Sequence, residues 1–152
     1  MQIICFVCLF FAEVLYAQSR TETPSTISYS VSNMSFEEVQ LRISNELQVN
    51  AFNIVHEINI AKSLEAVSKS LDKPPLIEKA ISIGFCKPSV SYKMLEKNID
   101  ALLYCPLKLL IFQAKDSPSI SISFLKAPHL NEQIDPKKLD ETIENIITSA
   151  LD

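Results

Sequence analysis

Hydrophobic and polar residues follow two simple patterns along this chain. Between residues 27 and 31 apolar side chains alternate with serines, which is the two-residue period of a β-strand with one buried face. Between residues 36 and 47 apolar side chains recur at three- and four-residue spacing, and Ser35 with Glu38 forms a capping box at the start. The sequence therefore predicts a strand that is followed by an amphipathic helix.

The same two patterns assign elements to the rest of the chain. Asp135 followed by Pro136 opens the last helix, whereas Pro74 and Pro75 end an earlier one. We expect further strands over residues 52–60, 77–86, 107–114 and 119–125, and further helices over 61–71, over about ten residues from Pro88, and over 136–151.

The predicted order of elements is β-α-β-α-β-α-β-β-α. The predicted strands carry polar residues at alternate positions, whereas strands of parallel sheets are buried on both faces and are apolar throughout. We therefore expect an α+β fold, a two-layer sandwich in which a mainly antiparallel sheet carries helices on one face. Since no repeat or second domain is visible, residues 27–152 are predicted to form a single domain.

One predicted strand places a histidine among apolar residues. One face of the alternating run carries Phe52, Ile54, His56, Ile58 and Ile60, and Glu57 belongs to the polar set. A lone histidine in such a place is usually a hydrogen-bonded core residue, and a role as a metal ligand is the alternative. We interpret His56 as part of the core.

The first 17 residues have the pattern of an export signal. An apolar run of about ten residues is as long as the central region of a signal peptide and too short to cross a bilayer. Ala17 is the expected cleavage site, although neither Lys nor Arg precedes the run, and a buried helix or strand is the alternative. We expect residues 1–17 to be removed, residues 18–26 to form a flexible lead-in, and the mature chain to be exported to the periplasm or the exterior without an integral membrane segment.

Composition and charge exclude some functions. The chain has 152 residues and a net charge of −4, with both signs scattered and no cluster of Lys or Arg. Nucleic acid is therefore not expected as a partner, because neutralising phosphates requires clustered positive charge. The sequence also contains no glycine-rich phosphate loop, nucleophile elbow or zinc-protease motif, so we predict no cofactor and no catalytic residue, and we favour a function that is not enzymatic.

The mature chain keeps one pair of cysteines. Cys5 and Cys8 leave with the predicted leader, which leaves Cys86 and Cys105. In an oxidising compartment two cysteines can form a disulfide, provided that their Cα atoms lie within about 7 Å. This condition requires antiparallel neighbouring strands, in which the end of one lies beside the start of the next. Our hypothesis is that the strands are antiparallel and that the two sulfurs lie close together.

The cysteine-containing segments resemble a known family. An apolar strand that ends in Gly84, Cys86 and Pro88 is followed by a helix and then by Cys105 before another apolar strand, as in the family called domain of unknown function 302. The resemblance covers roughly residues 35–125. It implies an antiparallel sheet with helices on one side and implies no activity. The chain departs from the family pattern at Lys87 and around Cys105, where the family tends to carry asparagine.

The residues around Cys86 are candidates for chemistry. Cys86 precedes the start of a predicted helix, whose dipole together with Lys87 would stabilise a thiolate. A buried or disulfide-bonded cysteine is the structural alternative. By ligand type, Cys86, Cys105 and His56 would suit zinc or copper, although their spacing matches no known metal motif. We take Cys86 and Cys105 as the candidate functional or disulfide pair, and the candidate pocket around them consists of Gly84, Lys87, Pro88 and His56.

Two functions remain open at this point. The first is a binding or assembly module without enzymatic activity, which takes an unknown small ligand or forms a homodimer through a sheet edge or an apolar face. The alternative is a thiol redox or metal-handling protein that works through Cys86 and Cys105.

Overall fold

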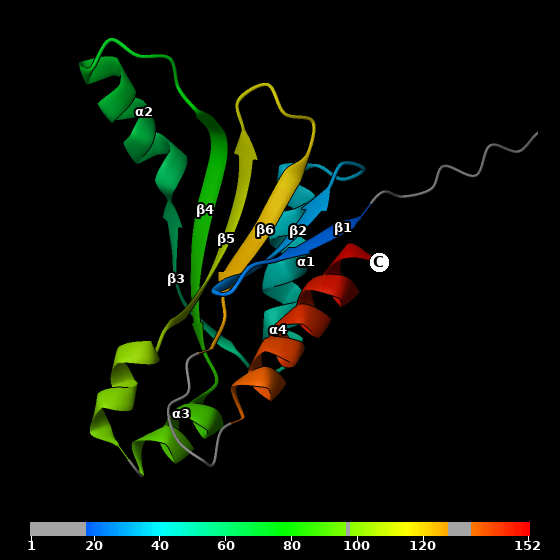
Figure 1. Ribbon diagram of the computed structural model, residues 1–152, viewed down its shortest axis with the longest axis vertical. Coiled ribbons are helices and arrows are strands. Elements are labelled where there is room, and N and C mark those ends of the chain that lie inside the picture. The colour runs from blue at the N-terminus through cyan, green and yellow to red at the C-terminus, as the bar shows by residue number, and fades with distance from the viewer. Residues whose placement is uncertain (1–17, 97, 128–134) are drawn as a thin grey trace, which may run out of the picture.

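The computed structural model describes residues 18–96, 98–127 and 135–152. Within these ranges six antiparallel strands form one sheet in the order β1-β2-β6-β5-β4-β3 (Figure 1). The strands are β1 (Ser19–Glu22), β2 (Thr26–Val31), β3 (Asn53–Asn59), β4 (Ile77–Cys86), β5 (Leu107–Ala114) and β6 (Ile120–Leu125). The helices are α1 (Phe36–Val49), α2 (Ile60–Ser70), α3 (Pro88–Leu95), the 3-10 helix η1 (Ile99–Tyr104) and α4 (Pro136–Leu151).

The predicted capping residues begin the two long helices. The Ser35 hydroxyl accepts a hydrogen bond from the backbone N–H of Glu38 at 3.2 Å at the start of α1. The Asp135 carboxylate accepts one from the backbone N–H of Lys137 at 3.0 Å at the start of α4, where Pro136 occupies the first turn. Each cap satisfies an N–H group that has no partner inside its helix.

Helices α1 and α4 pack against each other and cover one face of the sheet, and the main core lies between these two layers (Figure 1). The apolar positions of β2, β5 and β6 point into this core, which confirms the predicted α+β sandwich with an antiparallel sheet. Buried residues from the two helices are Phe36, Val39, Ile43, Leu47, Leu139, Ile143, Ile146, Ile147, Ala150 and Leu151.

The structure differs from the expected lead-in at residues 19–22. These residues form the edge strand β1, which pairs antiparallel with β2, for example Arg20 opposite Tyr29. All four side chains of β1 are exposed, so no alternation of apolar and polar residues marks it as a strand. The strand depends on backbone hydrogen bonds to β2, which a hydrophobicity pattern does not report.

The predicted arrangement of strand β3 is wrong after Ile54. A β-bulge at Val55 shifts the register, so that Ile54 lies opposite Phe85 while His56 lies opposite Gly84. Because a shift of one residue reverses every later side chain, His56 and Ile58 point to the face opposite the α1/α4 layer. Glu57 instead reaches α1, where its carboxylate accepts hydrogen bonds from the side chains of Gln40 at 3.0 Å and Ser44 at 3.2 Å.

Helix α2 stands apart from the other helices. It continues β3 beyond the end of the sheet and packs against β4 (Figure 1). No residue of α2 is buried, although the helix has a clear apolar side. This arrangement leaves an apolar surface at one end of the molecule.

The predicted export leader, residues 1–17, lies outside the described residues. None of the helices that the structure describes combines the length and the apolar content needed to cross a bilayer. Both long helices instead bury one apolar side against the sheet.

Candidate functional site

Cys86 and Cys105 form a disulfide, and their Cα atoms lie 5.9 Å apart. Cys86 is the last residue of β4, and Cys105 follows η1 just before β5 begins. Because β4 and β5 are antiparallel neighbours, the end of one strand lies beside the start of the next. The structure therefore confirms the hypothesis that the two sulfurs lie close together.

The disulfide lies beside a cavity that is too small for a substrate. The cavity measures about 20 Å³, which is enough for one water molecule. Its walls include Val90, Ser91 and Met94 of α3 together with the disulfide itself. The Ser91 hydroxyl lies 3.7 Å from Cys105 Sγ and points a hydrogen-bond donor toward the sulfur. Both cysteines are only half-buried, so the pair is not sealed inside the core.

Lys87 and Pro88 begin helix α3 next to the disulfide. Pro88 occupies the first turn, as predicted, and Lys87 is the N-cap residue, whose side chain forms no capping hydrogen bond. Lys87 Nζ lies 5.2 Å from the centre of the Phe52 ring, within the range of a cation–π interaction. Phe52 in turn meets Phe85 edge to face, with ring centres 5.4 Å apart. Lys87 thus covers an aromatic pair that is otherwise buried.

His56 and Gly84 form a separate contact on the opposite face of the sheet. A Cβ atom built on Gly84 would lie 2.3 Å from Cε1 of His56, so the imidazole ring occupies the space above the glycine. The bulge in β3 turns His56 away from the α1/α4 layer, and this side chain is half-buried instead of lying in the main core. The interpretation of His56 as a core residue is therefore wrong.

The three residues whose types would suit a metal ion do not form a site. Both sulfurs are bonded to each other, and the residue opposite Cys86 on β3 is Asn53 instead of His56. In the described parts of the chain, no three His, Cys, Asp or Glu side chains gather closely enough to hold a metal ion. Of the six candidate residues, the structure brings Cys86, Cys105, Lys87 and Pro88 together and leaves His56 with Gly84.

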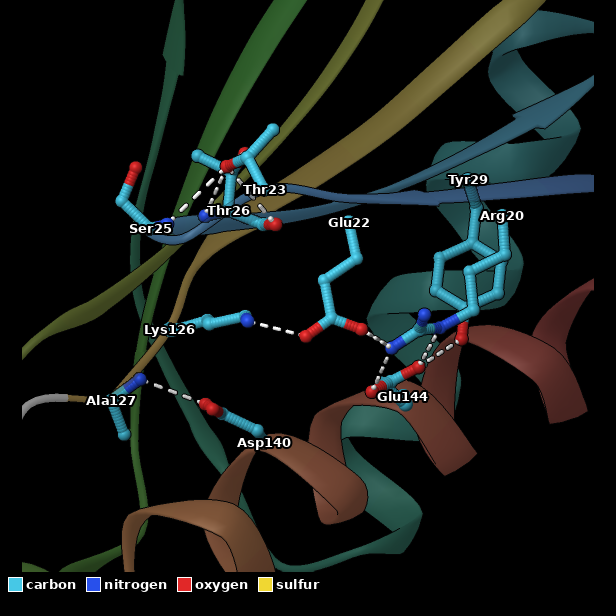
Figure 2. A network of polar contacts seen from close by, with 10 residues as sticks. All are labelled: Arg20, Glu22, Thr23, Ser25, Thr26, Tyr29, Lys126, Ala127, Asp140 and Glu144. Carbon is cyan, nitrogen blue, oxygen red and sulfur yellow. Dashed lines mark hydrogen bonds and ion pairs between the residues drawn. The ribbon is translucent and has the colours of Figure 1, made fainter.

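A second cluster of titratable residues joins β1 to α4 (Figure 2). The Arg20 guanidinium donates two hydrogen bonds to the Glu144 carboxylate, at 2.6 and 2.9 Å, and forms an ion pair with Glu22 at 2.8 Å. Glu22 also pairs with Lys126. The Tyr29 hydroxyl donates a third hydrogen bond to Glu144 at 2.5 Å. Every charged group in the cluster has a partner, so we interpret it as a clamp that holds the edge strand.

The clamp changes the pKa values of its members. The hydrogen bonds from Arg20, and then the one from Tyr29, lower the pKa of Glu144 below its usual range. Burial, followed by the hydrogen bond to Glu144, raises the pKa of Tyr29 to about 12. The sequence alone does not indicate this cluster, because Arg20 and Glu144 are 124 residues apart. The polar residues 18–26 show no pattern that would mark Arg20 as part of a cluster.

The Glu144→Gln variant is expected to lose about 1 kcal/mol of unfolding free energy at neutral pH, since the partly exposed bonds are weakened by solvent. A carboxylate with a lowered folded pKa stabilises the protein above its unfolded pKa, and this contribution is lost as the pH falls through the folded pKa. The difference in unfolding free energy between wild type and variant should therefore become smaller as the pH falls from about 7 toward about 3. Urea unfolding at several pH values measures it.

The exposed Glu141 of α4 provides the matched control, because Glu141→Gln removes the same charge outside the clamp. Burial raises the pKa of Asp140, and the nearby Glu144 charge adds a smaller rise. Asp140 therefore favours the folded state at acid pH in all three proteins, and the part of this contribution that comes from burial cancels in the comparison. A pH-independent difference between wild type and Glu144→Gln would contradict the ionic origin of the clamp.

Comparison with known proteins identifies the family of this chain. The profile of the family described as "Domain of unknown function DUF302" matches residues 27–151. No curated protein matches the sequence. A crystal structure of an uncharacterized conserved DUF302 protein from Bacillus stearothermophilus is similar in fold, with a TM-score of 0.57 and 17% sequence identity over 82% of this chain and 94% of that chain. The chain therefore belongs to the DUF302 family.

Proposed function

We propose that this chain is an exported, non-enzymatic assembly domain that forms a homodimer by pairing helix α2 with α2 of a second copy. The observation that carries the proposal is the apolar side of α2. Leu64, Val67 and Leu71 are 46%, 52% and 59% exposed, and Leu76 after the helix is 80% exposed. Large apolar patches on a protein surface usually mark interaction sites. The disulfide supports export, since such bonds persist in oxidising compartments.

The spacing of the apolar residues fits a helical partner. Ile60, Leu64, Val67 and Leu71 follow one another at intervals of four, three and four residues, which is the a/d seam of a coiled coil. A stripe of this width can pack against one other element, as the similar stripe of α1 does in the main core. Within the described residues Leu64, Val67 and Leu71 of this seam remain exposed. A second α2 would cover it.

A groove beside α2 is open to a partner. It has a volume of about 570 Å³ and lies between α2 and the segment that leads into β4. Leu64, Val67 and Leu71 line one wall, and residues 74–77, two of them prolines, line the other. The prolines restrict the backbone of the second wall, which limits its rearrangement when a partner binds.

The positions that flank the seam carry no charge. With Leu64 and Val67 at a and d, the flanking e and g positions are Ser63, Ser68 and Ser70. Glu65 and Lys69 pair with each other at 2.7 Å on the outer side of the helix. Two identical α2 helices can therefore meet along the seam without repulsion between like charges, which an isologous interface must avoid.

The test is the oligomeric state of the full mature chain, measured by sedimentation equilibrium. We expect a dimer for the wild type and a monomer for Val67→Glu, because the substitution places a charge in the centre of the seam. The matched control is Val49→Glu, at a valine of α1 that is 78% exposed and does not line the groove; it should remain dimeric. A wild type that stays monomeric at about 100 μM would contradict the proposal.

The second candidate function is thiol redox chemistry. It is favoured by the position of Cys86 immediately before α3, where the helix dipole and Lys87 would stabilise a thiolate after reduction. This function requires that the disulfide can be reduced by physiological thiols. The stability of the disulfide toward reduction therefore separates it from a purely structural role.

A further inference from the structure

We infer that the cleft between α3 and α4 binds a small organic anion with an apolar body, such as a carboxylate attached to a short hydrocarbon. This site is separate from the α2 groove, and the inference does not depend on homodimer formation. The cleft has a volume of about 240 Å³. It is thus smaller than the usual site of a drug-sized molecule, which begins at about 300 Å³. Figure 1 shows α3 and the first turns of α4 at the same end of the molecule.

The two walls of the cleft carry three lysines. Lys87 and Lys93 come from the side of α3, and Lys138 comes from the first turn of α4. In the parts of the chain that the structure describes, none of these three lysines takes part in a salt bridge. Asp135 is the one acidic residue among the described residues that line the cleft. Asp135 already caps α4 through the N–H of Lys137. The cleft is therefore locally positive on a protein whose net charge is −4.

Both helices add to the positive potential. Lys87 and Val90 belong to the start of α3, and Asp135 and Lys138 to the start of α4, so the N-terminal ends of both helices border the cleft. The N-terminus of a helix carries a partial positive charge that favours a bound anion. The start of α3 also has no side-chain cap. The lysines and the two helix N-termini thus both favour a bound anion.

The floor of the cleft is apolar. Phe52 and Leu139 lie there, and both are almost fully buried, while Val90 is half-buried beside them. A hydrated inorganic ion would gain nothing from such a floor. An anion with a hydrocarbon or aromatic body would place its charged group among the ammonium groups and its body against Val90, the part of the apolar floor that is not fully buried. The combination of apolar floor and cationic walls defines the ligand class.

The probe for the test is 8-anilinonaphthalene-1-sulfonate, a dye that combines an anion with an apolar body and fluoresces when it leaves water. The full mature chain is titrated with the dye beside the double variant Lys93→Gln/Lys138→Gln. Both lysines are exposed, so the variant is expected to fold. We expect the affinity to fall about tenfold or more, because two ammonium groups are removed from the walls.

Two controls separate charge from other effects. Lys137→Gln removes a charge from the neighbouring position on α4, which does not line the cleft, and should change the affinity by less than about twofold. The charge-conserving variant Lys93→Arg/Lys138→Arg should keep most of the affinity. Equal dye affinity of wild type and Lys93→Gln/Lys138→Gln would overturn the inference.

Competition and a third variant define the ligand and the location. Octanoate should displace the dye, whereas octylamine, which has the same tail and the opposite charge, and inorganic phosphate, which has no tail, should not. Displacement by phosphate or octylamine as effective as that by octanoate would overturn the ligand class. Val67→Glu, in the α2 groove, should bind the dye as the wild type does. Loss of dye binding in that variant would place the dye in the α2 groove and overturn the assignment of the site.

Discussion

Replacing both Cys86 and Cys105 by alanine is expected to lower the free energy of unfolding by about 3 kcal/mol. The disulfide joins residues 19 positions apart and restricts the unfolded chain by closing that loop. The enclosed segment contains only α3 and η1, in which Met94 and Ala101 are the buried apolar residues. These two residues bury too little apolar surface to hold the segment in place without the disulfide. Urea unfolding of wild type and variant measures the loss.

The double variant lacks the two sulfur atoms as well as the bond between them. The reduced wild type, which keeps both sulfur atoms, is therefore the control. Addition of dithiothreitol should shift its unfolding to that of the double variant, and the double variant should not respond to the reductant. For a structural disulfide we expect a reduction potential below about −300 mV, measured against glutathione mixtures. A potential near about −200 mV, with little change in stability on reduction, would contradict the structural role and favour the redox function.

Replacing Gly84 by alanine is expected to destabilise the protein by about 2 kcal/mol, within the range found for overpacked sites. The added Cβ would lie 2.3 Å from the His56 ring, and Gly84 itself is buried. The ring must therefore rotate away or the two strands must separate. Thermal or urea unfolding of the variant gives the magnitude.

A double-mutant cycle identifies the cause of this loss. If the ring of His56 is the obstacle, the double variant Gly84→Ala/His56→Ala should recover most of the stability that Gly84→Ala loses relative to a His56→Ala background. Ser82→Ala, at the next position of β4 on the same face, is the control and should have a small effect. If His56→Ala gives no recovery, the loss arises in the backbone of β4 and the steric explanation fails.

The local elements of the fold could be predicted from the sequence because their signals lie within a few residues. The predicted strands 77–86 and 107–114 have the observed bounds, and the stripe of α4 is buried as its spacing indicated. Polar residues at alternate positions also predicted the antiparallel sheet. The closeness of Cys86 and Cys105 followed from that topology, since antiparallel neighbours bring one strand end beside the next strand start.

Other features depend on pairing between distant segments, and no local pattern reports them. Strand β1 exists because its backbone pairs with β2, although its side chains are all exposed. The side of the sheet that His56 occupies was decided by one bulged residue, Val55, and a bulge reverses the apparent alternation.

Most of the helices and strands, the antiparallel α+β class and the closeness of the two cysteines could be predicted from the amino-acid sequence, because each rests on periodicity or on short spacing. The packing of the elements, in contrast, leaves the apolar side of α2 uncovered and places Lys93 and Lys138 on the walls of one cleft. Whether an amphipathic helix finds a partner, and which charges become neighbours, depends on how elements pack. Packing joins residues that lie far apart in the chain, and their spacing carries no signal of it.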